Sequence, residues 1–323
     1  MRRPNGHGVL ITLALLVLLL PVFGAPVKTF RIKKVGRAPN FIALSPDGYR
    51  LYATSVNTDE LLQISISQRM VVQSVAVGSR PLGLAIADQG KTALVACSDS
   101  NTVAFVDLEA FRVIGDVKVT GQPNSIVVSP RGYRAFVATT GRTREGFVHI
   151  IDIRERRLTG SIKVGASPFA ITVSPVTELV YVTMGGGNEV WVVDPDRQQV
   201  LNKITVGEGP DGIAITPDGK RVFVANSKTG DLSVIDTQVN KVLLTVPIGK
   251  MPFGVAVSND GKRVFVVNYE SRNVAVLPTD LSTLDPETFE VDRGPTDIKI
   301  APNNRTVYVV NEVSNSIVIA DLE

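Results

Sequence analysis

The chain has 323 residues, of which 44% are apolar and 20% are charged, and its formal net charge is +3 at pH 7. Its single cysteine, Cys97, excludes an intrachain disulfide, so the fold must be stabilised by packing. Removal of Arg2 and Arg3 with a leader would leave 32 Lys and Arg against 31 Asp and Glu. This near-neutral balance argues against a nucleic-acid partner.

Residues 1–24 have the pattern of a bacterial secretory signal peptide. Arg2 and Arg3 precede an apolar run at 9–20 that is too short to span a hydrocarbon core of ~30 Å, and Val22 and Gly24 satisfy the small-residue rule for cleavage. An uncleaved anchor is the alternative. We therefore expect residues 25–323 to be a single domain, exported to the periplasm or cell surface, with no membrane span after cleavage.

Seven prolines then recur at intervals of 42 to 45 residues. They are Pro39, Pro81, Pro123, Pro168, Pro210, Pro252 and Pro295. Each unit contains four Val- and Ile-rich runs, separated by turn sequences such as Pro217-Asp218-Gly219. A repeat of this length with four short strands predicts one blade of a β-propeller, because each small sheet buries its faces only against its neighbours. The predicted fold is an all-β, seven-bladed propeller.

One column of the repeat is almost entirely aromatic. It contains Tyr52, Leu94, Phe136, Tyr181, Phe223, Phe265 and Tyr308, all in the predicted second strand. Large flat side chains at this spacing favour burial between adjacent blades, with ligand stacking as the alternative.

The two ends of the repeat region predict how the ring closes. Residues 27–35 precede the first proline and correspond to a fourth strand, whereas residues 317–321 correspond to a third strand. Pairing of the first strand with the last three would complete blade seven and protect both exposed edges.

The units resemble the YVTN family of β-propeller repeats from about residue 27 to residue 323. The tetrad that gives the family its name occurs as Tyr181-Val-Thr-Met184, Phe223-Val-Ala-Asn226, Phe265-Val-Val-Asn268 and Tyr308-Val-Val-Asn311. The resemblance implies the propeller architecture more than a particular chemistry. Exported propellers of this kind can accompany periplasmic quinoprotein (PQQ-dependent) dehydrogenases, so an accessory role in such a system is one implied function.

The sequence contains few groups suited to catalysis. His149 is the one histidine after the leader, and the chain lacks a nucleophile elbow, a haem-attachment Cys-x-x-Cys-His, a zinc-binding His pair and a calcium loop. We predict no catalytic residue, no cofactor and no metal. His149 is interpreted as a hydrogen-bonded strand residue, and Cys97, which aligns with Asn226, Asn268 and Asn311, as a buried thiol; catalytic and reactive roles are the respective alternatives.

The proline loops and the loops between second and third strands should share one face of the ring. On it, the residue after each proline is predicted to surround the channel mouth: Asn40, Leu82, Asn124, Phe169, Asp211, Phe253 and Thr296. Irregular loops in repeats three and four, with Arg142, Arg144, Gly185, Gly186 and Gly187, are the predicted adapted loops. These residues form either a binding surface or a packed plug.

We therefore predict an exported, monomeric, non-catalytic propeller that presents this loop face to a protein partner or small ligand. The alternatives are an accessory protein of a PQQ-dependent dehydrogenase and a lactonase-type propeller enzyme.

Overall fold

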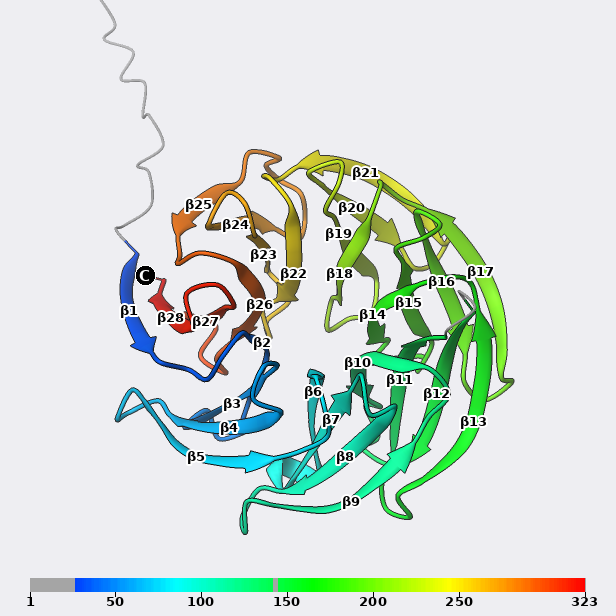
Figure 1. Ribbon diagram of the computed structural model, residues 1–323. Coiled ribbons are helices and arrows are strands. Elements are labelled where there is room, and N and C mark those ends of the chain that lie inside the picture. The colour runs from blue at the N-terminus through cyan, green and yellow to red at the C-terminus, as the bar shows by residue number, and fades with distance from the viewer. Residues whose placement is uncertain (1–26, 142–144, 323) are drawn as a thin grey trace, which may run out of the picture.

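Each repeat folds into one antiparallel sheet of four strands, because its four Val- and Ile-rich runs are joined by short turns. The computed structural model describes residues 27–141 and 145–322, and the predicted signal peptide lies outside them. Seven such sheets stand around a common centre, so the predicted seven-bladed propeller is confirmed (Figure 1). Within the described residues no helix is long and apolar enough to span a bilayer.

The first three blades follow the chain in groups of four strands. Blade 1 comprises β2 (Pro39–Leu44), β3 (Arg50–Ser55), β4 (Glu60–Ser65) and β5 (Met70–Ala76). Blade 2 comprises β6 (Pro81–Ala87), β7 (Thr92–Cys97), β8 (Thr102–Asp107) and β9 (Arg112–Lys118), with the short 3₁₀ turn η1 (Asp88–Gly90). Blade 3 comprises β10 (Gln122–Val128), β11 (Arg134–Thr140), β12 (Gly146–Asp152) and β13 (Arg157–Val164).

The next three blades repeat this order. Blade 4 comprises β14 (Pro168–Val173), β15 (Val180–Met184), β16 (Glu189–Asp194) and β17 (Gln199–Thr205). Blade 5 comprises β18 (Pro210–Ile215), β19 (Arg221–Asn226), β20 (Asp231–Asp236) and β21 (Lys241–Pro247). Blade 6 comprises β22 (Pro252–Val257), β23 (Arg263–Asn268), β24 (Asn273–Pro278) and β25 (Glu287–Glu290).

Blade 7 is assembled from both ends of the chain, as predicted. It comprises β26 (Pro295–Ile300), β27 (Thr306–Asn311) and β28 (Ser316–Asp321), and its outermost strand is β1 (Lys28–Lys33). β1 pairs antiparallel with β28, with Ile32 opposite Ile317. This pairing gives blade 7 the same four strands as the others and leaves no gap in the ring.

The repeat proline stands at or beside the start of each innermost strand, where its missing N–H costs no ladder bond. Just after it, the pairing with the second strand shifts register, for example between Pro210 and Ile213. In blade 5, Pro210 lies opposite Asn226, and Asn226 lies opposite Asp231. The proline loops and the loops between second and third strands therefore occupy the same end of the ring, which we call the proline face.

The aromatic column is buried between blades, which confirms its predicted packing role. All seven of its side chains are at most 4% exposed. Phe136 of blade 3, for example, packs in one apolar cluster with Val180 and Val182 of blade 4.

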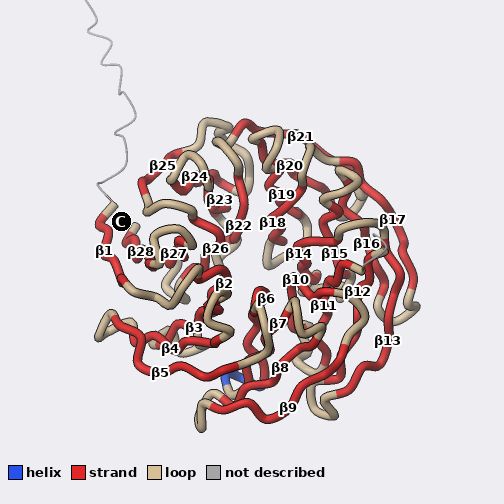
Figure 2. Tube along the Cα trace, viewed as in Figure 1, coloured by secondary structure: helices blue, strands red, loops and turns tan. Residues whose placement is uncertain are grey.

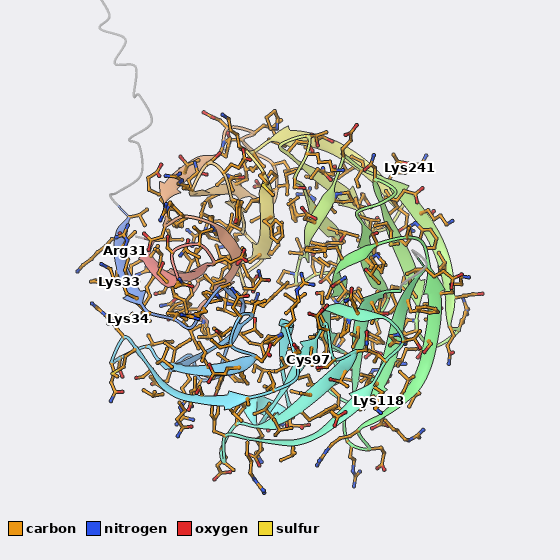
Figure 3. All side chains as sticks on the ribbon, viewed as in Figure 1. Arg31, Lys33, Lys34, Cys97, Lys118 and Lys241 are labelled. Carbon is orange, nitrogen blue, oxygen red and sulfur yellow. The ribbon has the colours of Figure 1, made fainter. Side chains whose placement is uncertain are left out.

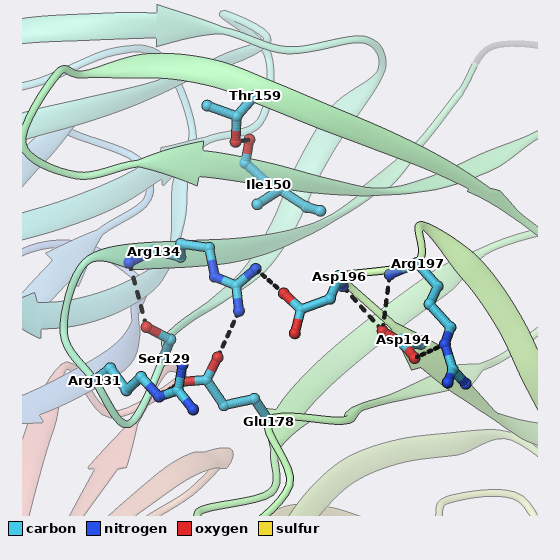
Figure 4. A network of polar contacts seen from close by, with 9 residues as sticks. All are labelled: Ser129, Arg131, Arg134, Ile150, Thr159, Glu178, Asp194, Asp196 and Arg197. Carbon is cyan, nitrogen blue, oxygen red and sulfur yellow. Dashed lines mark hydrogen bonds and ion pairs between the residues drawn. The ribbon is translucent and has the colours of Figure 1, made fainter.

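Arginines at the start of second strands link successive blades on the opposite face. The Arg134 guanidinium lies 2.5 Å from Glu178 Oε2 and 2.6 Å from Asp196 Oδ1, both in blade 4 (Figure 4). At the equivalent positions, Arg221 and Arg263 donate to the carbonyls of Thr279 and Asn304. The irregular turn of repeat four, which lacks Pro-Asp-Gly, places Glu178 in this network.

Candidate functional site

The innermost strands of all seven blades surround a central cavity of about 240 Å³. Figure 2 shows these strands, β2, β6, β10, β14, β18, β22 and β26, facing the centre of the ring. Most of the lining is apolar, with Leu84, Ile126, Ile171, Ile213 and Val255 contributed at one aligned position of five blades. The cavity is thus a small apolar space on the axis of the ring.

The seven residues predicted to surround the channel mouth all lie near the start of innermost strands on the proline face. Phe169, Phe253 and Thr296 line the central cavity. The other four, Asn40, Leu82, Asn124 and Asp211, are half-buried and lie outside the lining.

Two of these seven side chains hold neighbouring blades together. Asn124 Nδ2 donates to Thr140 Oγ1 at 3.1 Å and to the Pro168 carbonyl of blade 4 at 3.2 Å. Thr296 is 4% exposed, and its hydroxyl donates to the Asn40 carbonyl of blade 1 at 2.7 Å. At Asn124 and Thr296 the structure therefore shows hydrogen bonds that join neighbouring blades, as the packing alternative predicts.

Phe169, Phe253 and Tyr269 form an aromatic cluster at the mouth. The rings of Phe169 and Phe253 meet edge to face, with centroids 5.6 Å apart, although they belong to blades 4 and 6. Gly212 of blade 5 lets the backbones of blades 5 and 6 approach closely, because a methyl group there would lie 1.8 Å from the Phe253 carbonyl oxygen. The Tyr269 ring lies 6.4 Å from that of Phe253 and extends the cluster toward the β23–β24 loop.

Asp211 and Glu312 are half-buried carboxyl groups on the proline face that have no ion-pair partner within the described residues and have raised pKa values. Burial raises the pKa of Asp211, an effect opposed by Ser227 and Lys228. Burial likewise raises the pKa of Glu312, opposed by Arg80. The charge of Glu312 in turn helps to raise the pKa of Tyr269, which places this carboxylate close to the aromatic cluster.

The predicted adapted loops are only partly described. Arg142 and Arg144 lie outside the described residues. Gly185, Gly186 and Gly187 form the tight β15–β16 turn, in which the Gly185 N–H donates to the Ser167 carbonyl at 3.0 Å. This turn belongs to the proline face, and its binding role stays a prediction.

Sequence reasoning missed an ion pair inside the cavity. Lys299 Nζ lies 2.9 and 2.8 Å from the two carboxylate oxygens of Asp297, and both residues line the cavity. The signal was present in the repeat alignment. Two residues after the proline most blades have Gly, Ser or Ala, and four residues after it the other six have Ala, Val or Thr. Blade 7 alone has a charge at both positions.

His149 and Cys97 are both buried, as predicted. His149 Nδ1 lies 2.8 Å from Ser161 Oγ and Nε2 lies 2.9 Å from the Thr120 carbonyl, and burial lowers the pKa of the imidazole. Cys97 is 0% exposed, and burial raises the pKa of its thiol to about 11. Figure 3 shows Cys97 inside the ring, whereas Lys118 and Lys241 lie on its outer edge. A buried thiol with a raised pKa stays protonated near neutral pH and is therefore a poor nucleophile.

Comparisons with known proteins support the fold. The family model described as "Cytochrome D1 heme domain" matches residues 174–320, which is less than half of the chain. A solved chain of Kuenenia stuttgartiensis hydrazine synthase is similar in structure, with a TM-score of 0.80 and 22% identity over 90% of this chain and 97% of that chain. No curated protein matches. These likenesses show a propeller and leave the YVTN resemblance as a prediction.

The haem named in the description of that family does not fit the central cavity. Haem iron is held by His, Cys, Met or Tyr, and none of these is among the described residues that line the cavity. The volume of about 240 Å³ is also too small for a macrocycle of the size of haem. In the described ranges no three His, Cys, Asp or Glu side chains gather into a metal site. We therefore derive no chemistry from haem here.

Proposed function

We propose that this protein is an exported, non-catalytic binding propeller that captures a protein partner on its proline face. The observation that carries the proposal is the aromatic cluster of Phe169, Phe253 and Tyr269, whose half-buried rings lie at the mouth of the ring. Partly exposed aromatic side chains in a central position are typical anchors of protein interfaces. The opposite face carries the inter-blade arginine links instead.

The charges around the cluster suggest the chemistry of the partner surface. Asp211 and Glu312 are half-buried carboxyl groups with raised pKa values and no ion pair within the described residues. A partner that brings Lys or Arg side chains next to an apolar anchor would neutralise both groups. Such pairing would add specificity and speed of association more than affinity.

Export and the absence of catalysis are parts of the same proposal. The sequence of residues 1–24 supports export, and binding requires no reactive group. The buried, doubly hydrogen-bonded His149 and the buried Cys97 thiol support a non-catalytic role.

Capture experiments on the mature protein test the working face. With a periplasmic extract as the source of partners, Phe169→Ala and Phe253→Ala should each weaken capture by about 2 kcal/mol, or about thirtyfold. Arg142→Ala should weaken it far less, because a single charge outside the aromatic cluster contributes little. Tyr49→Ala is the matched aromatic control, since Tyr49 is 75% exposed in the β2–β3 turn of the opposite face. Loss of capture in Tyr49→Ala with normal capture by both Phe variants would place the binding surface on the face opposite the proline face and contradict the proposal.

An accessory role in a redox system is the second candidate. It is supported by the names of the two similar proteins, a cytochrome haem domain and hydrazine synthase, and by the YVTN resemblance. Mass spectrometry of the captured partner distinguishes this candidate from a general scaffold, because it predicts a periplasmic dehydrogenase, such as a PQQ-dependent one. No observation in the described residues favours the lactonase-type alternative.

A further inference from the structure

The ion pair of Asp297 and Lys299 is the only pair of charged residues among the described residues that line a mostly apolar cavity. At the same two aligned positions blade 5 has Gly212 and Ala214, and blade 6 has Gly254 and Ala256. Blades 5 and 6 complete the same ring with small apolar residues at these positions, of which Gly212 and Gly254 line the cavity, so the fold itself does not require charges there. A buried ion pair is also often no more stabilising than apolar residues of similar volume. The pair is therefore available for a role other than stability.

The two partners of the pair differ in their access to the cavity. Asp297 has a side chain that is 8% exposed, and its oxygens contact Lys299 and accept the Ile42 N–H of blade 1 at 3.1 Å. The Lys299 side chain is 36% exposed. Lys299 Nζ also donates to the Ile298 carbonyl at 3.3 Å. Asp297 thus holds the ammonium group in place, and Lys299, with the more exposed side chain, is the half of the pair that a ligand can reach.

The remaining lining fits a small apolar body. Phe169 and Phe253 contribute aromatic rings, and Ile171 and Ile213 contribute aliphatic side chains. The volume of about 240 Å³ corresponds to roughly eight water molecules at about 30 Å³ each. A compact aromatic or branched aliphatic group fits this space, whereas a macrocycle does not.

We propose that the central cavity binds a small, mostly apolar carboxylate whose charged group bonds to the Lys299 ammonium. Lys299 is then shared between Asp297 and the ligand, and the apolar part of the ligand packs against Phe169, Phe253, Ile171 and Ile213. A ligand ammonium group would instead face Lys299 with like charge, since Asp297 is already occupied. The site shares Phe169 and Phe253 with the capture surface, but its charged group, Lys299, lies outside the aromatic cluster, so the proposal goes beyond partner capture and does not depend on it.

Calorimetric titration of the purified mature protein tests the chemistry with three probes of nearly equal size: benzoate, benzamide and benzylamine. Benzoate is expected to bind with a Kd of about 1 mM or lower, given the limited energy available per ligand atom. Benzamide should bind more weakly through its carbonyl, and benzylamine should not bind. Equal binding of all three, a preference for benzylamine, or no binding of benzoate would overturn the proposal.

Variants within the cavity test the position of the site. Lys299→Gln should weaken benzoate binding about ten- to hundredfold, since it removes a charge-assisted hydrogen bond, and Lys299→Arg should retain it. Ala170→Leu, which keeps the ion pair and fills the cavity, should abolish binding. If circular dichroism shows that Lys299→Gln does not fold, the other two variants still test the site, because Lys299→Arg should retain benzoate binding and Ala170→Leu should lose it.

Unchanged benzoate affinity in Ala170→Leu would show that the ligand binds elsewhere and would overturn the proposal. Neither Lys299 nor Ala170 belongs to the aromatic cluster used for partner capture. Failure of the cavity site and failure of the proposed function are therefore distinguishable.

Discussion

Blades 5 and 7 are built from the same repeat, but they differ in two respects. Blade 5 is one continuous stretch of chain with Gly212 and Ala214 in its innermost strand, whereas blade 7 joins β1 to β28 and carries Asp297 and Lys299 at the aligned positions. The two blades have the same strand order and the same buried aromatic position, with Phe223 and Tyr308 at most 4% exposed. The two blades thus share the apolar contacts between sheets, and they differ in the side chains at two positions of the innermost strand.

The largest effect should come from opening blade 7. Deletion of residues 27–35 exposes the edge of β28 and removes the apolar contacts of Ile32 and Val35, both 0% exposed. The loss of two large buried side chains alone is about 3 kcal/mol or more, so the melting temperature and the solubility should fall together. Differential scanning calorimetry is the measurement. An unchanged transition would mean that β1 is not needed for closure.

Gly212→Ala should have the next largest effect, about 2 to 3 kcal/mol of lost stability. The added methyl group would lie 1.8 Å from the Phe253 carbonyl oxygen, and backbone cannot move aside as cheaply as a flexible side chain. Urea denaturation gives the free energy of unfolding. Blade 7 tolerates Asp297 at the equivalent position, so a neutral result would show that blade 5 can adopt the same spacing.

Removal of one member of the ion pair should cost more than removal of both. Lys299→Ala leaves the buried Asp297 without a counter-charge and should lower the free energy of unfolding by about 2 kcal/mol, less than for a fully buried pair because the Lys299 side chain is 36% exposed. Asp297→Gly combined with Lys299→Ala converts these two positions to those of blade 5 and should cost less than the single change. Equal losses in urea denaturation would contradict this expectation.

The smallest effect concerns His149, which aligns with Ser233 of blade 5. Burial lowers the pKa of His149 below its ordinary value of 6.5, so the unfolded chain binds a proton at a higher pH than the folded chain does. The stability contribution is present above about pH 6.5 and is lost as the pH falls toward the lowered pKa. His149→Ser should flatten this acid limb of a melting-temperature profile between pH 7 and pH 5. An identical slope in the variant would remove His149 as its source.

Residues at repeat positions could be predicted from the sequence because each is repeated. The seven prolines, the aromatic column and the turn sequences recur at one spacing, and together they predicted strand order, closure and the burial of Phe136 and Tyr181. The candidate site was predicted less fully. The Phe169 and Phe253 rings meet although they are 84 positions apart, and no local pattern indicates such a contact.

The sequence by itself determined the number of blades, the pairing of its two ends and the buried positions, because periodicity and hydrophobic alternation act locally and repeat. The tertiary structure alone decided what meets at the axis, where seven innermost strands bring single side chains from distant repeats together. There the rings of Phe169 and Phe253 meet, Gly212 lets the backbone of Phe253 approach, and Asp297 of blade 7 accepts a backbone N–H of blade 1. These contacts depend on the curvature of the closed ring, because only closure sets the distances between strands that are not neighbours in sequence.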